Sequence, residues 1–272
     1  MPCNFTDWSV ARVDLQVTDK VILISGGAKG IGAAIARSAA REGAIPVIVD
    51  RDARATEELQ SELNARNQPN HALTFDLCVA ENCSQIISSV LEKFGRLDAL
   101  VNNAGVNDGV GLEHGDPKAF VASLERNLLH YFNLAHYALP ALKKSRGSVV
   151  NIASKVAVTG QGGTSGYAAA KGGTLAMTRE WAVELAPFGI RVNAVVPAEV
   201  MTPLYRQWLD TFPNPQEKQA AIVARIPLEK RMTRPDEIAD GVLFLLSARA
   251  SHITGQHLFV DGGYVHLDRA LT

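Results

Sequence analysis

The sequence predicts an α/β protein in which one doubly wound domain, spanning residues 1–272, is built on a seven-stranded parallel sheet with helices on both faces. Short runs rich in valine and isoleucine alternate along the chain with longer segments of helical pattern. Strands buried on both faces are apolar throughout, and the helices between them form the crossover connections. The chain has 272 residues, 47% of them hydrophobic, which is enough for one sizeable core.

Each element can be placed from this alternation. The strands are expected at residues 21–25, 46–50, 72–75, 99–101, 149–152, 192–196 and 258–260. Helices are expected at residues 31–43, 53–66, 81–94, 117–144 and 167–186. The stretch 201–228 interrupts the alternation and contains aromatic residues and prolines. Since it follows the sixth strand, we expect a helical lid over a site at the carboxyl edge of the sheet.

Composition and charge exclude several classes of function. The net charge is −1 and no long run of one sign occurs, so we expect neither a nucleic-acid partner nor an anionic membrane partner. No apolar run reaches the roughly 18 residues of a membrane span, and no signal peptide is evident, so we expect a cytoplasmic protein. The three cysteines, Cys3, Cys78 and Cys83, form no CxxC pair, and we expect neither a disulfide framework nor a metal site.

The first strand runs into a glycine-rich turn at residues 25–32, with the sequence SGGAKGIG. Glycines let the backbone approach a pyrophosphate closely, and the helix that begins there offers free N–H groups and the positive end of its dipole. A tight turn alone would also explain the glycines, but Asp50 ends the second strand at the spacing of a ribose-binding carboxylate. The loop therefore predicts a Rossmann-type dinucleotide site.

The nature of residue 50 bears on the choice between NAD and NADP. The Asp50 carboxylate can accept hydrogen bonds from the ribose hydroxyls and would repel a 2′-phosphate, which favours NAD. Lys29 and Arg51 could bind a 2′-phosphate, so use of NADP stays open. A role for Asp50 as the cap of the next helix is the structural alternative.

Tyr167 and Lys171 are four residues apart in a segment of helical pattern, which puts them on one helix face. A free tyrosine has a pKa near 10, and a nearby cation favours the phenolate and lowers that pKa. Such a spacing also arises by chance on a solvated helix. Here the residues between them are all alanine and a glycine-rich loop precedes the helix. The pair therefore predicts a proton-transfer site beside a cofactor.

Taken together, these motifs resemble the short-chain dehydrogenase/reductase family, in its NAD-type subgroup, over residues 20–264. The glycine loop matches with Ser25 in place of the usual threonine, and residues 102–105 (NNAG) match the motif that ends the fourth strand. Ser154, thirteen residues before Tyr167, fits the catalytic serine, and Asn127 fits the catalytic asparagine. Residues 197–202 resemble the nicotinamide loop, with Ala198 where the family usually has glycine.

The resemblance implies a role for each of these residues. Tyr167 would take the proton of the substrate hydroxyl, and Lys171 would lower the tyrosine pKa and bind the nicotinamide ribose. Ser154 would hold the substrate oxygen, and Asn127 would support a proton relay through water to Lys171. Cofactor contacts are implied at Gly26, Lys29, Gly30, Ile31, Gly32, Asp50, Arg51, Asp76, Leu77, Asn103, Ala104, Gly105, Tyr167, Lys171, Pro197, Val200 and Thr202.

The substrate is expected to be polar, because many residues around the site can hydrogen-bond. Residues 101–113, 120–136, 159–167, 197–208 and 261–271 closely resemble bacterial L-fucose dehydrogenases of this family, which oxidise the anomeric carbon to the lactone. Substrate contacts are then expected at Ser154, Gln161, Tyr167, Glu199, Tyr205, Asn107 and Glu113. A carbonyl or hydroxysteroid oxidoreductase and a non-catalytic dinucleotide sensor are the alternatives. The family resemblance also implies a homotetramer that packs through the long helices and the C-terminal strand. Residues 265–272 are hydrophobic and charged by turns, and we expect them to reach a neighbouring subunit.

Overall fold

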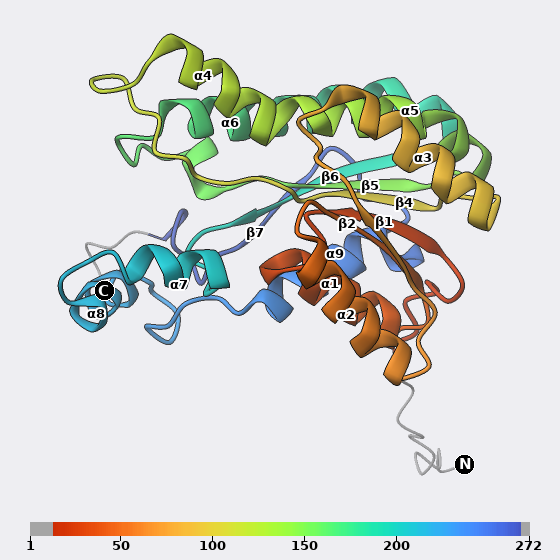
Figure 1. The fold of residues 1–272 in the computed structure, drawn as a ribbon, viewed down its shortest axis with the longest axis horizontal. Helices are drawn as coiled ribbons and strands as arrows, with labels where there is room; N and C mark the ends of the chain where they lie inside the picture. Colours follow the sequence, from red (N-terminus) through yellow and green to blue (C-terminus); the bar gives the residue numbers. More distant parts are fainter. Residues whose placement is uncertain (1–12, 268–272) are drawn as a thin grey trace, which may run out of the picture.

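The computed structural model describes residues 13–267 and contains one parallel sheet of seven strands. The strand order is β3-β2-β1-β4-β5-β6-β7, and every pairing is parallel (Figure 1). The strands are β1 (Val21–Ser25), β2 (Ile45–Asp50), β3 (His71–Thr74), β4 (Ala99–Asn102), β5 (Ser148–Ile152), β6 (Arg191–Pro197) and β7 (His257–Val260). The predicted fold class and all seven strands are confirmed.

Helices cover both faces of the sheet. On one face lie α1 (Gly30–Arg41), α2 (Ala53–Ala65) and α9 (Pro235–Leu246). On the other lie α3 (Ala80–Phe94), α4 (Pro117–Leu124), α5 (His130–Ser145) and α6 (Ser165–Leu185). No helix within residues 13–267 is long and apolar enough to cross a membrane.

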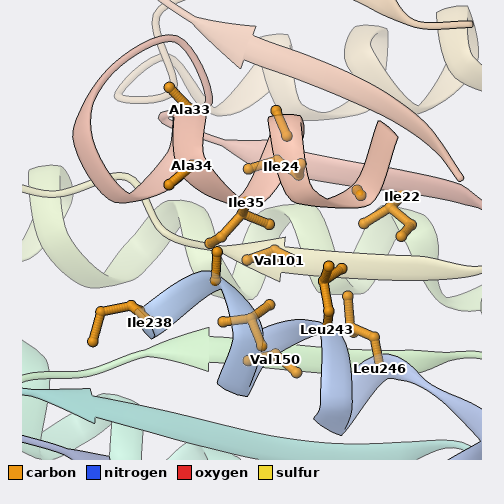
Figure 2. Close-up of a cluster of buried hydrophobic side chains, with 14 of the residues drawn as sticks. Ile22, Ile24, Ala33, Ala34, Ile35, Val101, Val150, Ile238, Leu243 and Leu246 are labelled. Atoms are coloured by element: carbon orange, nitrogen blue, oxygen red, sulfur yellow. The ribbon is translucent and has the colours of Figure 1, made fainter. Parts of the chain in front are cut away.

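Strand β1 explains why the predicted strands are apolar throughout. Its five residues are all buried, and successive side chains point to opposite faces of the sheet. Ile22 and Ile24 belong to the core under α1 and α9, which Figure 2 shows, whereas Val21 and Leu23 belong to the core under α3 and α5. Both faces of the strand therefore require hydrophobic side chains.

Helix α9 is absent from the predicted elements, although it packs along α1 against the sheet. It begins with Pro235 and carries Glu237 in its first turn, which are ordinary signals of a helix start. Its side chains Ile238, Leu243 and Leu246 reach the core shown in Figure 2. The continuous apolar run 242–246 hides the helical period, because this end of the helix is buried around most of its circumference.

The single helix predicted over residues 117–144 is wrong in detail, because a π-helical turn divides it. Between α4 and α5 the chain forms the segment η1 (Glu125–Leu129), which is wider than an α-helix. Its only buried residue is Asn127. Such turns are rare and are frequent at functional sites, because the extra residue turns a side chain in a direction that a regular helix would not give it.

The sheet provides a ligand crevice where its strand order reverses. Strand β1 lies between β2 and β4, and the connections that leave β2 and β4 run to opposite faces of the sheet (Figure 1); in doubly wound sheets, ligands bind at the carboxyl ends of the strands at such a point. The segment predicted as a lid contains α7 (Pro203–Leu209) and α8 (Pro215–Val223). Thr202, which caps α7, lies beside Gly30 of the glycine turn. Short 3-10 turns complete the fold: η2 (Lys155–Ala157), η3 (Ala186–Phe188) and η4 (Ala248–Ala250).

Candidate active site

The turn after β4 holds the glycine turn in place. The backbone N–H groups of Asn103 and Ala104 donate to the Ser25 hydroxyl oxygen at 2.9 and 3.2 Å. The Asn103 side-chain amide donates to the carbonyl oxygens of Ser25 and Gly26, both at 2.9 Å. The Ser25 hydroxyl thus joins the end of β1 to the turn after β4, and a threonine at this position would supply the same hydroxyl.

The glycine turn leaves no room for side chains and leaves donors free. Gly26 has a φ of +61°, and a Cβ on it would lie 2.8 Å from the Cα of Ala104. A Cβ on Gly32 would overlap the carbonyl oxygen of Gly26. Lys29, the N-cap of α1, makes no side-chain capping bond, so the first N–H groups of this helix have no side-chain partner. This cradle fits a pyrophosphate, which such N–H groups and the helix dipole bind.

The Asp50 carboxylate lies against the glycine turn. One of its oxygens accepts a hydrogen bond from the Ala28 N–H at 3.2 Å, and the other accepts from the Asp52 N–H at 3.1 Å. The capping role considered for Asp50 is wrong, because Asp52 caps α2 by accepting from the Ala55 N–H at 3.1 Å. Asp52 also pairs with Lys29, so that ammonium is held by a carboxylate.

The other expected cofactor positions lie at the same carboxyl edge of the sheet. Asp76 and Leu77 follow β3; the Asp76 carboxylate accepts from the Cys78 N–H at 2.9 Å, and Leu77 is buried. Arg51 is exposed at the end of β2. Three expected contacts lie at the end of β6 or in the loop after it: Pro197, Val200 and Thr202. Val200 forms a β-bridge with Thr233, and the Thr202 methyl group would lie 3.2 Å from a Cβ on Gly30. The residues present therefore fit a nicotinamide dinucleotide.

Tyr167 and Ser154 meet at the carboxyl end of β5. Ser154 is the N-cap of η2, and Tyr167 lies in the first turn of α6, where the Ser154 hydroxyl is close enough to act on the tyrosine pKa. Burial raises the pKa of Tyr167 to about 12; the bond with Ser154 opposes this rise, and the negative charge of Asp108 adds to it. Without a further positive charge nearby, this phenol stays protonated at neutral pH.

Lys171 lies one turn further along α6 and is only 2% exposed. Its ammonium nitrogen is 5.7 Å from the centre of the Tyr167 ring. Burial lowers the pKa of Lys171 to about 7, so the charged and neutral forms of this side chain are both present near neutral pH. The ammonium donates to the Tyr131 hydroxyl at 2.9 Å and to the Ile152 carbonyl at 2.8 Å.

Asn127 lies fully buried in the π-helical turn. Its side-chain oxygen accepts from the Val106 N–H at 2.7 Å, and its amide donates to the Ser123 carbonyl at 3.0 Å. A Cβ on Gly105 would lie 2.8 Å from the Asn127 oxygen and 3.4 Å from the Lys171 ammonium. Gly105 therefore lies between the Asn127 oxygen and the Lys171 ammonium. The expected relay through water remains a prediction.

Two of the expected substrate contacts come together around a residue that sequence reasoning missed. Glu199 forms an ion pair with Lys155, and both side chains are only 11% exposed. The Tyr205 hydroxyl donates to the second Glu199 oxygen at 2.7 Å, and burial and Glu199 both raise the pKa of Tyr205. The Lys155 ammonium also lies 4.3 Å from the centre of the Tyr264 ring. The position of Lys155, directly after Ser154, was the signal that could have found it.

The remaining expected contacts lie in two exposed loops that touch each other. Gly166, in the first turn of α6, donates its N–H to the Val110 carbonyl at 3.0 Å, and a Cβ on Gly111 would lie 3.0 Å from the Cα of Gly163 in the loop before α6. Asn107 and Gln161 lie exposed in these loops. The Glu113 side chain is 86% exposed and lies near His114, and the structure does not bring it to Ser154 or Tyr167. Within residues 13–267, no group of three or more potential ligands is placed to hold a metal ion.

The arrangement is suited to proton transfer at an alcohol or carbonyl beside a bound dinucleotide. A phenol, a hydroxyl and a desolvated ammonium converge at the end of β5, and a dinucleotide cradle lies at the end of β1. The phenol and hydroxyl can exchange a proton with a substrate oxygen, and a dinucleotide at the crevice can exchange a hydride with the adjacent carbon.

Comparisons with known proteins agree with this chemistry. The family model that matches residues 26–265 is described as Enoyl-(Acyl carrier protein) reductase. A 3-oxoacyl-(acyl-carrier-protein) reductase, FabG of Thermotoga maritima, is 35% identical over 92% of this chain and 100% of its own length. An L-fucose dehydrogenase of Oryctolagus cuniculus is 37% identical over 90% of this chain and 84% of its own length. The crystal structure of Cj0485 dehydrogenase is 47% identical, with a TM-score of 0.90 over 95% of this chain and 99% of that chain.

Proposed function

We propose, from the premise that this chain belongs to the short-chain dehydrogenase/reductase family and is an NAD(P)-dependent oxidoreductase of alcohols or carbonyls, that its substrate is a sugar. The sugar is L-fucose or a related L- or 6-deoxy aldose, oxidised at the anomeric carbon to the lactone. The resemblance to bacterial L-fucose dehydrogenases and the mammalian L-fucose dehydrogenase among the relatives support this substrate.

The proton chemistry is assigned to Tyr167, Ser154 and Lys171. Ser154 donates to the anomeric oxygen and holds it beside Tyr167, whose phenolate takes the hydroxyl proton as the carbonyl forms. Lys171, when charged, offsets the effect of burial and lowers the tyrosine pKa. Asn127 fixes the loop that carries Val106 and Gly105 beside this centre. A bound oxidised nicotinamide supplies the acceptor for the hydride that leaves the same carbon.

The preferred cofactor is NAD. The Asp50 carboxylate lies where it can accept from ribose hydroxyls, and a 2′-phosphate there would meet its negative charge. Lys29, which could have bound that phosphate, is paired with Asp52. A phosphate would therefore have to break an existing ion pair and approach two carboxylates.

The observation that carries the sugar proposal is the buried polar cluster of Lys155, Glu199 and Tyr205. A buried ion pair costs desolvation energy, and it is seldom retained only for stability. Directly after Ser154, it offers charged and hydroxyl groups that suit the vicinal hydroxyls of a sugar better than an apolar substrate. Helices α7 and α8 act as the lid, since Tyr205 of α7 belongs to this cluster.

A substrate panel tests this proposal. L-fucose, L-galactose, D-arabinose, a hydroxysteroid and a 3-oxoacyl thioester are assayed with NAD and with NADP, and Tyr167→Phe serves as the control. We expect sugar oxidation with NAD and no turnover by Tyr167→Phe, which should still bind NAD. Activity confined to the steroid or thioester would establish the carbonyl-type alternative, and binding of NAD without turnover of any substrate would indicate the dinucleotide sensor.

A homotetramer is the proposed assembly. Exposed apolar side chains along η1, α5 and α6 support it: Leu129, Phe132 and Val183. Light scattering of the purified protein would test it, and a monomer at micromolar concentration would contradict it. The role predicted for the tail concerns residues 265–272, of which 268–272 lie outside the described residues.

A further inference from the structure

Three polar groups form a closed triangle beneath Tyr167. The Lys171 ammonium donates to the Tyr131 hydroxyl at 2.9 Å and to the Ile152 carbonyl at 2.8 Å. The Tyr131 hydroxyl donates its own proton to the same Ile152 carbonyl at 3.1 Å. Each group is thus held by the other two, and the ammonium keeps one N–H for another partner.

The backbone makes this triangle possible. The ladder between β4 and β5 ends at the pair Asn102 and Asn151, so the Ile152 carbonyl lies one residue beyond it and is free to accept from side chains. Tyr131 follows the π-helical turn directly after His130, and its ring and hydroxyl are fully buried against the sheet. Burial raises the pKa of Tyr131 far above its usual value, so the phenol stays neutral.

The charge state of Lys171 depends on such contacts. Burial brings the pKa of this ammonium down to about 7, so one hydrogen bond decides how much of it is charged at neutral pH. A neutral phenol that accepts from an ammonium stabilises the charged form, because a bond to a charged group is stronger than one between neutral groups. The Asn127 side chain cannot replace it, because its oxygen accepts from Val106 and its amide donates to Ser123.

Other titratable groups surround the triangle. They are Tyr167 on α6, His130 on α5, Asp76 after β3 and Asp108 after β4. Burial lowers the pKa of His130 to about 4, so this imidazole is neutral at pH 7. Asp108 is paired with Arg126 at 2.8 Å. No carboxylate among the described residues hydrogen-bonds the ammonium, which leaves Tyr131 and Ile152 as its neutral acceptors.

We propose that Tyr131 is a positioning residue for the dehydrogenase reaction: its hydroxyl fixes the Lys171 ammonium and keeps it charged. In this role the Tyr131 hydroxyl is the oxygen that accepts from Lys171, at a place where the sequence predicted a water. The proposal rests on the roles assigned to Tyr167 and Lys171 in the proposed function. It does not depend on which alcohol is the substrate.

The test is Tyr131→Phe, which keeps the ring and removes the oxygen. With less charge on Lys171, the pKa of Tyr167 rises, and the ascending limb of kcat/KM for oxidation moves up by about half to one pH unit. We expect a loss of about three- to tenfold below that limb and near-complete recovery in the alkaline plateau. Tyr137→Phe, on the exposed part of α5, is the matched control and should leave the profile unchanged.

A second measurement uses the protein without cofactor. The pKa of Lys171 is lower in the folded chain than in the unfolded one, so its contribution to stability falls as pH falls from about 10.5 to about 7 and then levels off. Tyr131→Phe lowers the folded pKa further, so its Tm should drop below that of the wild type increasingly between pH 8 and pH 6. Above pH 8 the difference should be constant, because the folded lysine is neutral in both proteins.

The outcomes separate this inference from the proposed function. If Tyr167→Phe retains turnover, the proposed chemistry fails and the inference fails with it. If Tyr167→Phe is inactive but Tyr131→Phe loses activity equally at every pH, or loses none, the positioning role is refuted and the proposed chemistry stands. A limb shift together with the pH-dependent Tm difference supports the inference.

Discussion

The substitution Gly105→Ala tests whether the tight packing of the Asn127 and Lys171 side chains against Gly105 is needed for turnover. Gly105 does not have the positive φ that only glycine adopts easily, so alanine fits the backbone and the effect is purely steric. The added carbon would lie 2.8 Å from the Asn127 oxygen, whereas carbon and oxygen normally approach to about 3.3 Å. The oxygen must therefore retreat by about half an ångström, and its 2.7 Å bond to the Val106 N–H must lengthen.

The magnitude follows from this displacement. A shift of about 1 Å near reacting groups costs on the order of a hundredfold in rate, so half of it gives roughly tenfold in kcat. Overpacking costs about 1–3 kcal/mol, which lowers Tm by roughly 2–10 °C in a domain of this size. The assay is kcat with a saturating alcohol substrate, combined with thermal unfolding by circular dichroism, for Gly105→Ala.

The control is Gly160→Ala, which has no positive φ and where an added Cβ meets no atom within 4 Å. It should keep both kcat and Tm. If Gly105→Ala matches the wild type in both measurements, Asn127 and Lys171 are not held as closely as the structure has them. If Gly160→Ala loses as much as Gly105→Ala, the effect belongs to glycine replacement in general.

Two further substitutions address the cofactor and the buried lysine. Asp50→Asn keeps the hydrogen bond from the Ala28 N–H but removes the charge, so the ratio of kcat/KM for NAD over NADP should fall by about 10- to 100-fold; an unchanged ratio would show that this carboxylate does not select the cofactor. Lys171→Met should abolish turnover yet raise Tm by several degrees at pH 7, because a lysine with a folded pKa of about 7 is costly at and below that pH. Above about pH 10.5 the unfolded lysine is neutral too and the advantage should vanish, so an equal gain at pH 7 and pH 11 would contradict the linkage.

The sequence was sufficient where one local signal dominates. All seven strands followed from short apolar runs, because burial on both faces favours apolar side chains in the central strands; the edge strands β3 and β7 are only half-buried. The glycine turn and Asp50 followed from a fixed spacing, and the contacts of Asp50 with Ala28 and Asp52 agree with it. Helix α9 was missed for the opposite reason, since its buried end carries no amphipathic period.

The missed residues depend on contacts that no spacing encodes. Tyr131 contacts Lys171 of another helix from the first turn of α5, directly after a π-helical turn, and such a turn has no sequence signature in a single chain. Lys155 reaches Glu199 only because the ends of β5 and β6 lie side by side in the sheet. Sequence spacing identifies partners on one helix, whereas partners across strands require the topology.

The carboxyl end of β5 explains why these groups occur together. The Ile152 carbonyl holds Lys171, the Ser154 hydroxyl holds Tyr167, and the Lys155 ammonium holds Glu199. Three of the four consecutive positions from Ile152 to Lys155 thus contact either the proton-transfer centre or the cluster proposed to recognise the sugar. The two sites are therefore carried by the buried end of β5 and by η2, which begins after two intervening residues. A substitution that changes substrate preference at Lys155 should therefore also disturb the pH dependence set by Tyr167, which links specificity and catalysis through one short segment of backbone.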